Sequence, residues 1–283
     1  MSLPVPGSLT PSKVAAFKDC ALAFRFSVID RLPEPPSIPA LKGTLVHRAL
    51  QGLFWDQSPG ERTPEAAMAH LRAVCRRARE APEGDELGPA SEEEWQELEG
   101  DAEAMIARYF QLEDPNRVTA VGVELTLEVR LGRLLLRGII DRLDLDEDGS
   151  LVVTDYKTGR VPSQATEQSR LGGVHFYAFL CERVLGVRPA RVQLLYLREP
   201  LAISTVPSDH SIRGLQQKTS AIWSAILRAC EHDDFRPHPS GLCEYCAFRP
   251  YCPAWGGDPS LAVTEREASV ALPLPALAVS AAD

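Results

Sequence analysis

The sequence lacks the features that would place this chain in a membrane, in a secretory pathway or among repeat proteins. Its 283 residues contain no apolar run that approaches the roughly 20 residues needed to cross a bilayer. The first residues, MSLPVPGSLTPSK, contain neither the basic nor the long apolar segment of a secretory signal. No internal repeat and no G-x-x-x-x-G-K-S/T phosphate-binding loop is visible. We therefore expect a cytoplasmic protein without membrane contact.

Basic side chains are missing from one long segment, residues 80–103, which holds eleven Asp and Glu and no Lys or Arg. The net charge of the chain is -9, so this run accounts for all of the excess negative charge, and the remaining residues together carry +2. The run is most simply a solvated loop and helix face. The remainder is neutral to mildly basic, which allows a local site for an anionic ligand.

Apolar spacing and turn signals predict an α/β protein. A proline-rich connector, RLPEPPSIPA, precedes a helix that begins at Gly43. We expect one domain over residues 8–256 with a helical insertion at about 64–112, and a flexible tail at 257–283. The predicted helices are 10–20, 64–79, 91–112, 166–185 and 209–233, and the predicted strands are 120–131, 133–145, 150–157 and 191–199, the first three antiparallel.

Two carboxylates and a lysine flank the turn DEDG between two predicted strands. If Leu145 faces Leu151 across this turn, then Asp141 faces Asp155, and like charges that close are destabilising. Lys157 lies two residues after Asp155 and shares its face of the strand. Carboxylates that converge among apolar residues favour a bound cation, and oxygen ligands suit Mg²⁺ or Mn²⁺. Alone, a D-x-K tripeptide is more often an ordinary polar strand end.

The segments GIIDRLD and VVTDYKTG resemble the nuclease core of the PD-(D/E)XK superfamily in its RecB-like branch. That branch includes the RecB and AddB nuclease domains, CRISPR-associated RecB-type exonucleases and stand-alone bacterial RecB family exonucleases. The resemblance implies a restriction-endonuclease-like mixed sheet flanked by helices, and a metal-dependent DNA exonuclease of repair or recombination. It implies that Asp141, Asp155 and His47, the last residue of GTLVH, bind Mg²⁺ or Mn²⁺. Lys157 would be the catalytic lysine.

Three further positions of the family pattern are only partly matched. Glu124 stands where members usually carry a glutamate, although an exposed strand residue is an equally good interpretation. Tyr177 fits the tyrosine of the family's Q-x-x-x-Y helix, but Gly173 occupies the glutamine position. We expect the Gly172–Gly173 pair to break this helix. The absence of the glutamine affects the positioning of DNA, and His175 or Gln168 would be the residues that take its place.

The cysteines include a compact trio, CEYCAFRPYC, which supplies Cys243, Cys246 and Cys252 and needs a fourth ligand. Zinc and iron–sulfur clusters both accept four thiolates, and His238 or Cys230 would be a local fourth ligand for zinc. A subset of RecB-like nucleases binds a 4Fe-4S cluster with one cysteine before the core and three after it. That resemblance implies Cys20 as the fourth ligand, and a cluster that staples the two ends of the domain.

The implied partner is DNA with a free end or a single-stranded part, and a separate helicase or recombination protein would supply any unwinding. Arg72, Arg76 and Arg79 share one face of a predicted helix, where they either follow a DNA backbone or pair with the acidic run. Two other functions remain open. One is a non-catalytic DNA-binding or assembly subunit, which Gly173 favours, and the other is hydrolysis of RNA or nucleotide phosphodiesters.

Overall fold

The computed structural model describes residues 2–34, 37–80, 89, 91–161 and 164–262, with the backbone alone at 164–172. The chain forms two compact units. The first, which we call the sheet unit, consists of residues 8–11 and 36–221. The second, the cysteine unit, consists of residues 1–7, 12–35 and 222–283. Most of the tail predicted at 257–283 lies outside the described residues. No described helix is both long and apolar enough to span a membrane.

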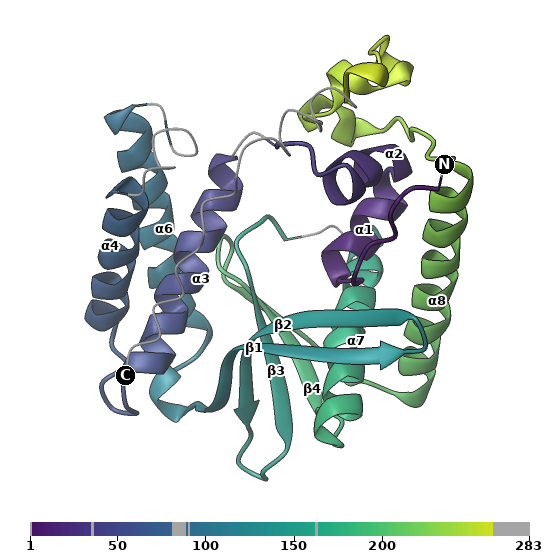
Figure 1. Ribbon diagram of the computed structural model, residues 1–283. Helices are drawn as coiled ribbons and strands as arrows, with labels where there is room; N and C mark the ends of the chain where they lie inside the picture. The colour runs from purple at the N-terminus through teal and green to yellow at the C-terminus, as the bar shows by residue number, and fades with distance from the viewer. Residues whose placement is uncertain (1, 35–36, 81–88, 90, 162–163, 263–283) are drawn as a thin grey trace, which may run out of the picture. The chain divides into compact units, whose positions relative to one another are not determined.

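The sheet unit is built on one five-stranded mixed sheet in the order β1-β2-β3-β4-β5 (Figure 1). The three antiparallel strands predicted from the sequence are confirmed, and β4 adds to β3 in parallel. β5, an edge strand that the sequence did not predict, pairs antiparallel with β4. The strands are β1 Thr119–Leu131, β2 Leu134–Leu145, β3 Leu151–Lys157, β4 Arg191–Tyr196 and β5 Leu201–Thr205.

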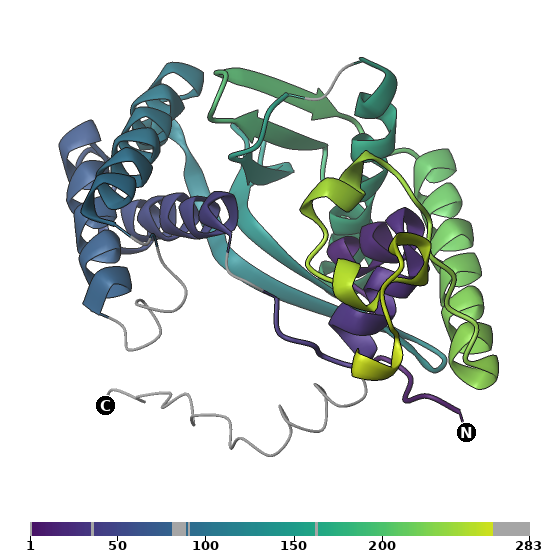
Figure 2. The same ribbon diagram turned by 90° about the horizontal axis from the view of Figure 1, so that it is seen from above.

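Three helices bury one face of this sheet, and the picture from above shows them gathered on one side (Figure 2). Apolar side chains of all three pack with Tyr156 of β3 and with Leu195 of β4. Ser37 caps the first of them, so that helix begins at Ile38, earlier than predicted. Pro39 is tolerated because the first turn of a helix has no partner for its backbone N–H groups. The helices are α3 Ile38–Asp56, α4 Pro64–Glu80 and α6 Glu92–Leu112.

The other face of the sheet is approached by α7, Gln164–Leu185, which connects β3 to its parallel neighbour β4. A Cβ atom at Gly138 of β2 would lie 2.7 Å from Leu180 Cδ1, so this glycine allows the close contact of helix and strand. The predicted helix break at Gly172–Gly173 is wrong, because α7 is continuous through both. A helical glycine costs only about 1 kcal/mol, which the packing of Phe176 and other residues of the next turns offsets.

The cysteine unit combines N-terminal helical segments with the C-terminal part of the chain. Phe26 and Phe248, which come from these two parts, are both buried, and their ring centroids lie 5.6 Å apart. Arg25 also connects them, through its ion pair with Asp233 at 2.6 Å, and pairs with Asp30 of its own segment at 3.0 Å. The helical segments are α1 Pro11–Asp19, α2 Ala21–Phe24, the π-helix Arg25–Ile29, α8 Asp209–His232 from Ile222 onward, and short 3-10 turns at Gly241–Tyr245, Arg249–Tyr251 and Pro253–Trp255.

Candidate active site

The candidate site lies where β2 and β3 stop pairing. The two strands pair from Leu145↔Leu151 to Arg142↔Thr154, which confirms the predicted register. Asp141 and Asp155 are the next residues on each strand, and both are buried. Beyond this point β2 pairs with β1 alone and β3 with β4 alone, and Figure 1 shows the two ribbons separating. The carboxylates therefore occupy the start of an opening within the sheet.

Asp141 replaces the missing ladder contact with its side chain. The backbone N–H of Tyr156 donates to Asp141 Oδ2 at 2.7 Å. The second oxygen, Oδ1, lies 3.5 Å from His47 Nδ1 on α3. Since one oxygen is held by the backbone, the other has a defined direction toward the imidazole. The strand therefore presents a preoriented carboxylate oxygen to any cation bound there.

His47, Glu124 and Asp141 form the one group of three metal-ligand side chains found among the described residues, with one ligand atom from each within 4.8 Å of the others. The His47 ring meets the Tyr156 ring edge-on, with centroids 5.9 Å apart. Burial lowers the pKa of His47, but the carboxylates, Asp141 first, outweigh it and the pKa is raised. This arrangement has the mixed nitrogen and oxygen donors that suit Mn²⁺ and, less well, Mg²⁺.

Glu124 reaches this group through a strained backbone. Its φ is 49°, in the left-handed region that residues other than glycine rarely adopt. A bulge between Ala120 and Gly122 precedes it in β1. Burial and then Asp141 raise the pKa of the Glu124 carboxyl. Such strain costs about 1–3 kcal/mol and is typical of functional sites. Of the two interpretations that the sequence left open, the structure places Glu124 beside the other ligand candidates.

Asp155 and Lys157 form an ion pair at the same opening, in which Asp155 is buried and Lys157 is partly exposed. Lys157 Nζ lies against Asp155 Oδ2, yet that oxygen has no directed hydrogen bond within the described chain. Tyr177 of α7 lies close enough to the Asp155 carboxyl for the two to influence each other electrostatically. Burial raises the pKa of Asp155, and Asp141 raises it further against the effect of Lys157. A buried carboxylate oxygen without a hydrogen bond is a fitting ligand for a cation.

The donor set therefore fits a divalent cation. Three carboxyl groups, an imidazole and a single ammonium converge, and the pKa values of Glu124 and Asp155 are both raised. Each raised pKa means that the folded protein resists a further negative charge there. A bound cation would remove this penalty. At the usual glutamine position, Gly173 offers no side chain, and a Cβ there would touch nothing within 4 Å. His175 Nδ1 is buried and has no hydrogen-bond partner among the described residues, and Gln168 lies outside the described side chains.

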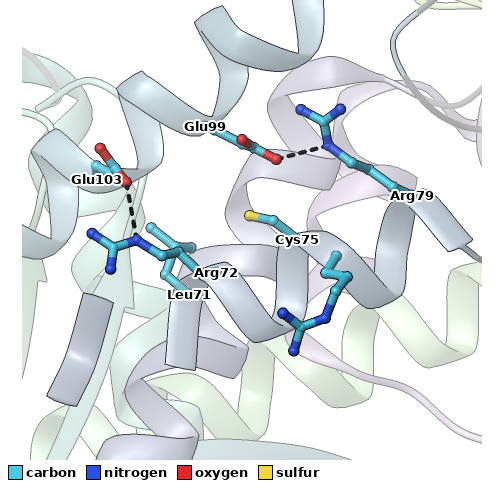
Figure 3. Close-up of a pocket in the computed structure, with 7 residues that line it drawn as sticks. Leu71, Arg72, Cys75, Arg79, Glu99 and Glu103 are labelled. Atoms are coloured by element: carbon cyan, nitrogen blue, oxygen red, sulfur yellow. Dashed lines mark hydrogen bonds and ion pairs between the residues drawn. The ribbon is translucent and has the colours of Figure 1, made fainter. Parts of the chain in front are cut away.

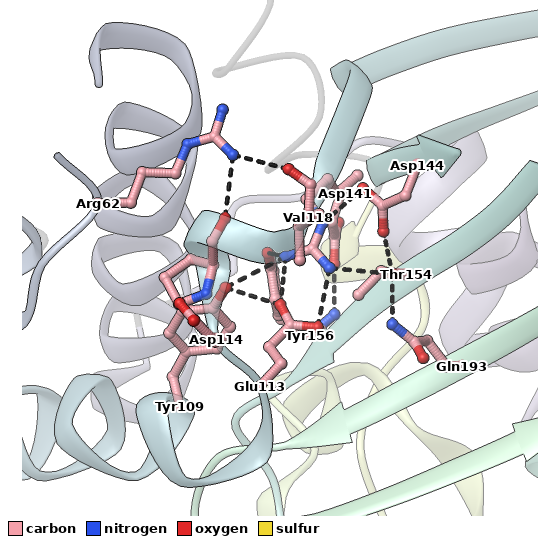
Figure 4. A network of polar contacts seen from close by, with 12 residues as sticks. Arg62, Tyr109, Glu113, Asp114, Val118, Asp141, Asp144, Thr154, Tyr156 and Gln193 are labelled. Atoms are coloured by element: carbon pink, nitrogen blue, oxygen red, sulfur yellow. Dashed lines mark hydrogen bonds and ion pairs between the residues drawn. The ribbon is translucent and has the colours of Figure 1, made fainter. Parts of the chain in front are cut away.

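A buried polar network on the opposite face of β2 and β3 was missed by the sequence reasoning (Figure 4). Its centre is Arg142, whose side chain is 1% exposed. The guanidinium donates to Asp144 Oδ1 at 2.7 Å, to the Tyr156 hydroxyl at 2.8 Å and to Glu113 Oε2 at 3.0 Å. Thr154 joins it by donating to Asp144 Oδ2 at 2.9 Å. Charged residues two apart in DRLD share a strand face, which was the available signal.

The four predicted cluster cysteines are neighbours within the cysteine unit. Burial raises the pKa of Cys246, and Cys20, Cys243 and Cys252 act on it electrostatically in the same direction. Backbone N–H groups of His238 and Ser240 donate to Cys20 and Cys243 sulfur, each at 3.4 Å. The alternative ligand Cys230 instead faces the Pro4 carbonyl at 3.7 Å.

The spacing of these sulfurs distinguishes two kinds of metal centre. Four thiolates on one zinc ion lie about 3.8 Å apart, as follows from Zn–S bonds of about 2.3 Å in a tetrahedron. Among the described residues, no three cysteine or histidine ligand atoms lie within 4.8 Å of one another. A four-iron cube holds its thiolates farther apart than a single zinc ion does. In the described part of the chain, the cysteine sulfurs therefore do not have the close spacing of ligands on a single zinc ion.

The arginine face of α4 borders a small pocket of about 160 Å³ against α6 (Figure 3). Arg79 pairs with Glu92 at 2.7 Å and with Glu99 at 2.9 Å. Arg72 lies 4.0 Å from Glu103. Two of the three arginines thus pair with the acidic run, as one of the two interpretations predicted.

Comparison with known proteins gives a family and a fold. The sequence profile of the PD-(D/E)XK nuclease superfamily matches residues 8–253. No curated protein matches the chain. A putative exonuclease from Eubacterium rectale has a similar structure, with a TM-score of 0.55 and 13% identity over 85% of this chain and 87% of that one. A second structure, SSO0001, is 13% identical over 88% and 86% of the two chains, with a TM-score of 0.41.

Proposed function

The chain belongs to the PD-(D/E)XK nuclease superfamily, and from that premise we propose that it is a divalent-metal-dependent DNA exonuclease of repair or recombination. Its substrate is DNA with a free end or a single-stranded part, and a separate protein supplies any unwinding. The observation that carries the proposal is the convergence of His47, Glu124 and Asp141 beside the Asp155–Lys157 pair. The exonuclease similarity of the Eubacterium rectale protein supports it at the level of the fold.

The metal ligands in this proposal are His47, Asp141 and Asp155, with Glu124 as a further ligand or an acceptor for a metal-held water. When bound, Mg²⁺ or Mn²⁺ supplies charge stabilisation on a phosphoryl oxygen and activation of water. The backbone N–H of Tyr156 holds Asp141 in position. This contact leaves the other oxygen of Asp141 correctly directed before the cation arrives. Tyr177 of α7 lies beside the Asp155 carboxyl and influences it electrostatically.

Lys157 acts as a charged donor to the attacking water or to a phosphoryl oxygen. Burial lowers its pKa, but the ion pair with Asp155 outweighs burial and the pKa is raised. The side chain therefore stays an ammonium throughout the neutral range. Its side chain is 40% exposed, so one side of the ammonium faces the opening while the other contacts Asp155. This position lets one residue hold both a ligand carboxylate and the incoming reactant.

For the cysteine unit we propose a 4Fe-4S cluster bound by Cys20, Cys243, Cys246 and Cys252. The four are neighbours, and no three of their sulfurs have the close spacing that a zinc ion needs. Protein purified without oxygen is expected to contain about four irons per chain with equal sulfide. Cys20→Ser should lose most of both, whereas Cys230→Ser, the matched control, should keep them. Stoichiometric zinc in the wild-type protein would contradict the cluster.

The nuclease proposal is tested with end-labelled linear DNA, covalently closed circular DNA and RNA, each with Mg²⁺ or Mn²⁺. We expect metal-dependent loss of nucleotides from ends of linear DNA, and no cleavage of the closed circle. Asp155→Asn and Lys157→Met should abolish it, while the surface variants Asp148→Asn and Lys218→Met should not. DNA binding without cleavage under either metal would instead indicate a non-catalytic subunit. Preferential loss of RNA would indicate a ribonuclease.

A further inference from the structure

Tyr196, the last residue of β4, has a buried hydroxyl group that the fold leaves without a partner. Its side chain is fully buried. The hydroxyl oxygen makes no hydrogen bond within the part of the chain that the structure describes. A buried hydroxyl that makes no hydrogen bond destabilises a protein, and phenylalanine would fill the same space without that cost. The position therefore calls for an explanation beyond packing.

Other buried tyrosines near the sheet do have partners. The Tyr156 hydroxyl accepts a hydrogen bond from Arg142 at 2.8 Å, and the Tyr109 hydroxyl donates one to Glu113 at 2.7 Å. Both phenols belong to the network on the α3 side of the sheet (Figure 4). Tyr196 belongs to the opposite face, because its neighbour Leu195 packs on the α3 side with Tyr156. The unpartnered hydroxyl is thus a local feature of the face to which Asp155 and Lys157 point.

Tyr196 is the direct neighbour of Lys157. The two residues pair in the parallel ladder of β3 and β4, and side chains of paired residues point to the same face. The charge of Lys157 and the phenol also influence each other electrostatically. Lys157 carries three N–H donors, and Asp155 is the partner that the structure shows for its ammonium. The pairing of β3 and β4 therefore places the Tyr196 hydroxyl, an acceptor without a donor, beside the Lys157 ammonium, which has further N–H groups to donate.

We propose that Tyr196 is a positioning residue for Lys157, whose ammonium donates to the Tyr196 hydroxyl once Asp155 turns its oxygens to a cation. The inference rests on the proposed nuclease function. In the structure Lys157 lies against Asp155 Oδ2, the same oxygen that suits a cation. When that oxygen is used, the ammonium needs another acceptor, and Tyr196 supplies one on the sheet side. The remaining N–H groups of Lys157 then point toward the opening and the DNA.

The variant that tests this is Tyr196→Phe, which removes one oxygen and keeps the ring. We expect an unchanged or higher midpoint of thermal unfolding, since the lost hydroxyl has no partner. In contrast, Tyr156→Phe should lower the midpoint, because it removes an acceptor from Arg142. With linear DNA, Tyr196→Phe should lower kcat about 10- to 100-fold, the usual effect of a misplaced reacting group, and leave KM within about twofold.

A second measurement reports the hydrogen bond itself, without reference to cleavage. The chain has six tyrosines, so protein labelled with ¹³C at tyrosine Cζ gives six resonances, and Tyr196→Phe identifies the one from Tyr196. That resonance should shift when Mg²⁺ and a short DNA are added, and the shift should be absent in Lys157→Met. An unmoved resonance together with wild-type kcat in Tyr196→Phe would overturn the inference while the nuclease stands. A wild-type protein that cleaves no DNA would instead overturn the proposed function.

Discussion

Replacing Arg142 by methionine removes the one cation at the centre of the buried network. Its guanidinium contacts Asp144, Glu113 and the Tyr156 hydroxyl, and lies 4.4 Å from the centroid of the Phe54 ring. Methionine keeps much of the apolar stem and removes the charge and all the donors. Two carboxylates, whose side chains are 8% and 16% exposed, then lose their counter-ion. The variant therefore leaves buried negative charge uncompensated.

The expected loss is large relative to the stability of a typical domain. Removing one partner of a buried ion pair costs about 3–5 kcal/mol, mainly because the other charge stays buried. The free energy of unfolding of a typical domain is about 5–15 kcal/mol, so the Arg142→Met protein should be folded at neutral pH but only marginally stable. Urea unfolding followed by circular dichroism at pH 7.5 measures this difference directly, provided that the slope with urea stays the same.

The loss should be smaller at pH 5 than at pH 7.5. Burial already raises the pKa of Asp144 in the wild-type protein, and Arg142 opposes that rise. Without Arg142 the pKa rises further. A carboxyl whose pKa is higher in the folded state stabilises the fold while protonated, and that stability disappears as pH rises through the folded pKa. The variant should therefore lose stability between pH 5 and 7.5 more steeply than the wild type.

Arg62 supplies the matched control, because it is also buried but its hydrogen bonds go to neutral groups. It donates to the backbone carbonyls of Gln57, Pro115 and Val118 at 2.9–3.1 Å. Arg62→Met should depend on pH much less than Arg142→Met, since none of these acceptors titrates and Asp144 acts on Arg62 only electrostatically, without a hydrogen bond. A loss below about 1 kcal/mol for Arg142→Met, with no pH dependence, would refute the argument from buried charge.

Three further changes test other parts of the structure. Gly138→Ala places a Cβ 2.7 Å from a leucine of α7 and should cost about 1–3 kcal/mol in urea unfolding, whereas Gly100→Ala, in open space on α6, should gain about 0.5–1 kcal/mol. Glu124→Gly should relieve the strain of the left-handed backbone and raise the melting temperature, while Mn²⁺ should stabilise this variant less than it stabilises the wild type. A fall in the melting temperature would argue against stored strain. Mn²⁺ at 100 times its Kd should raise the free energy of unfolding of the wild type by about 2.7 kcal/mol, and that of Asp141→Asn hardly at all. This stabilisation by Mn²⁺ should become smaller as pH falls through the raised pKa of His47, because only the neutral imidazole binds metal.

Much of the site could be predicted because its determinants are local. The DEDG turn sets the register of β2 on β3, so a count of residues placed Asp141 opposite Asp155. A period of two placed Lys157 on the face of Asp155 in any register. Helices α4, α6, α7 and α8 followed from apolar spacing, with ends correct to within a few residues. In each case the signal and the structure lie within one or two neighbouring elements.

What only the tertiary structure decided involves residues from distant elements. The sequence reasoning gave no role to Arg142 and Asp144, because their partner Glu113, which follows α6, comes from a distant part of the chain, and a buried charge is stable only with such a partner. The left-handed backbone of Glu124 and the unpartnered hydroxyl of Tyr196 follow from the way β1 and β4 join the sheet. Local propensity favours neither feature. The sequence by itself therefore determined the register and the chemical groups of the site. The separation of β2 from β3 and the packing of α3 and α7 decided which of these groups meet, because those contacts depend on the whole chain.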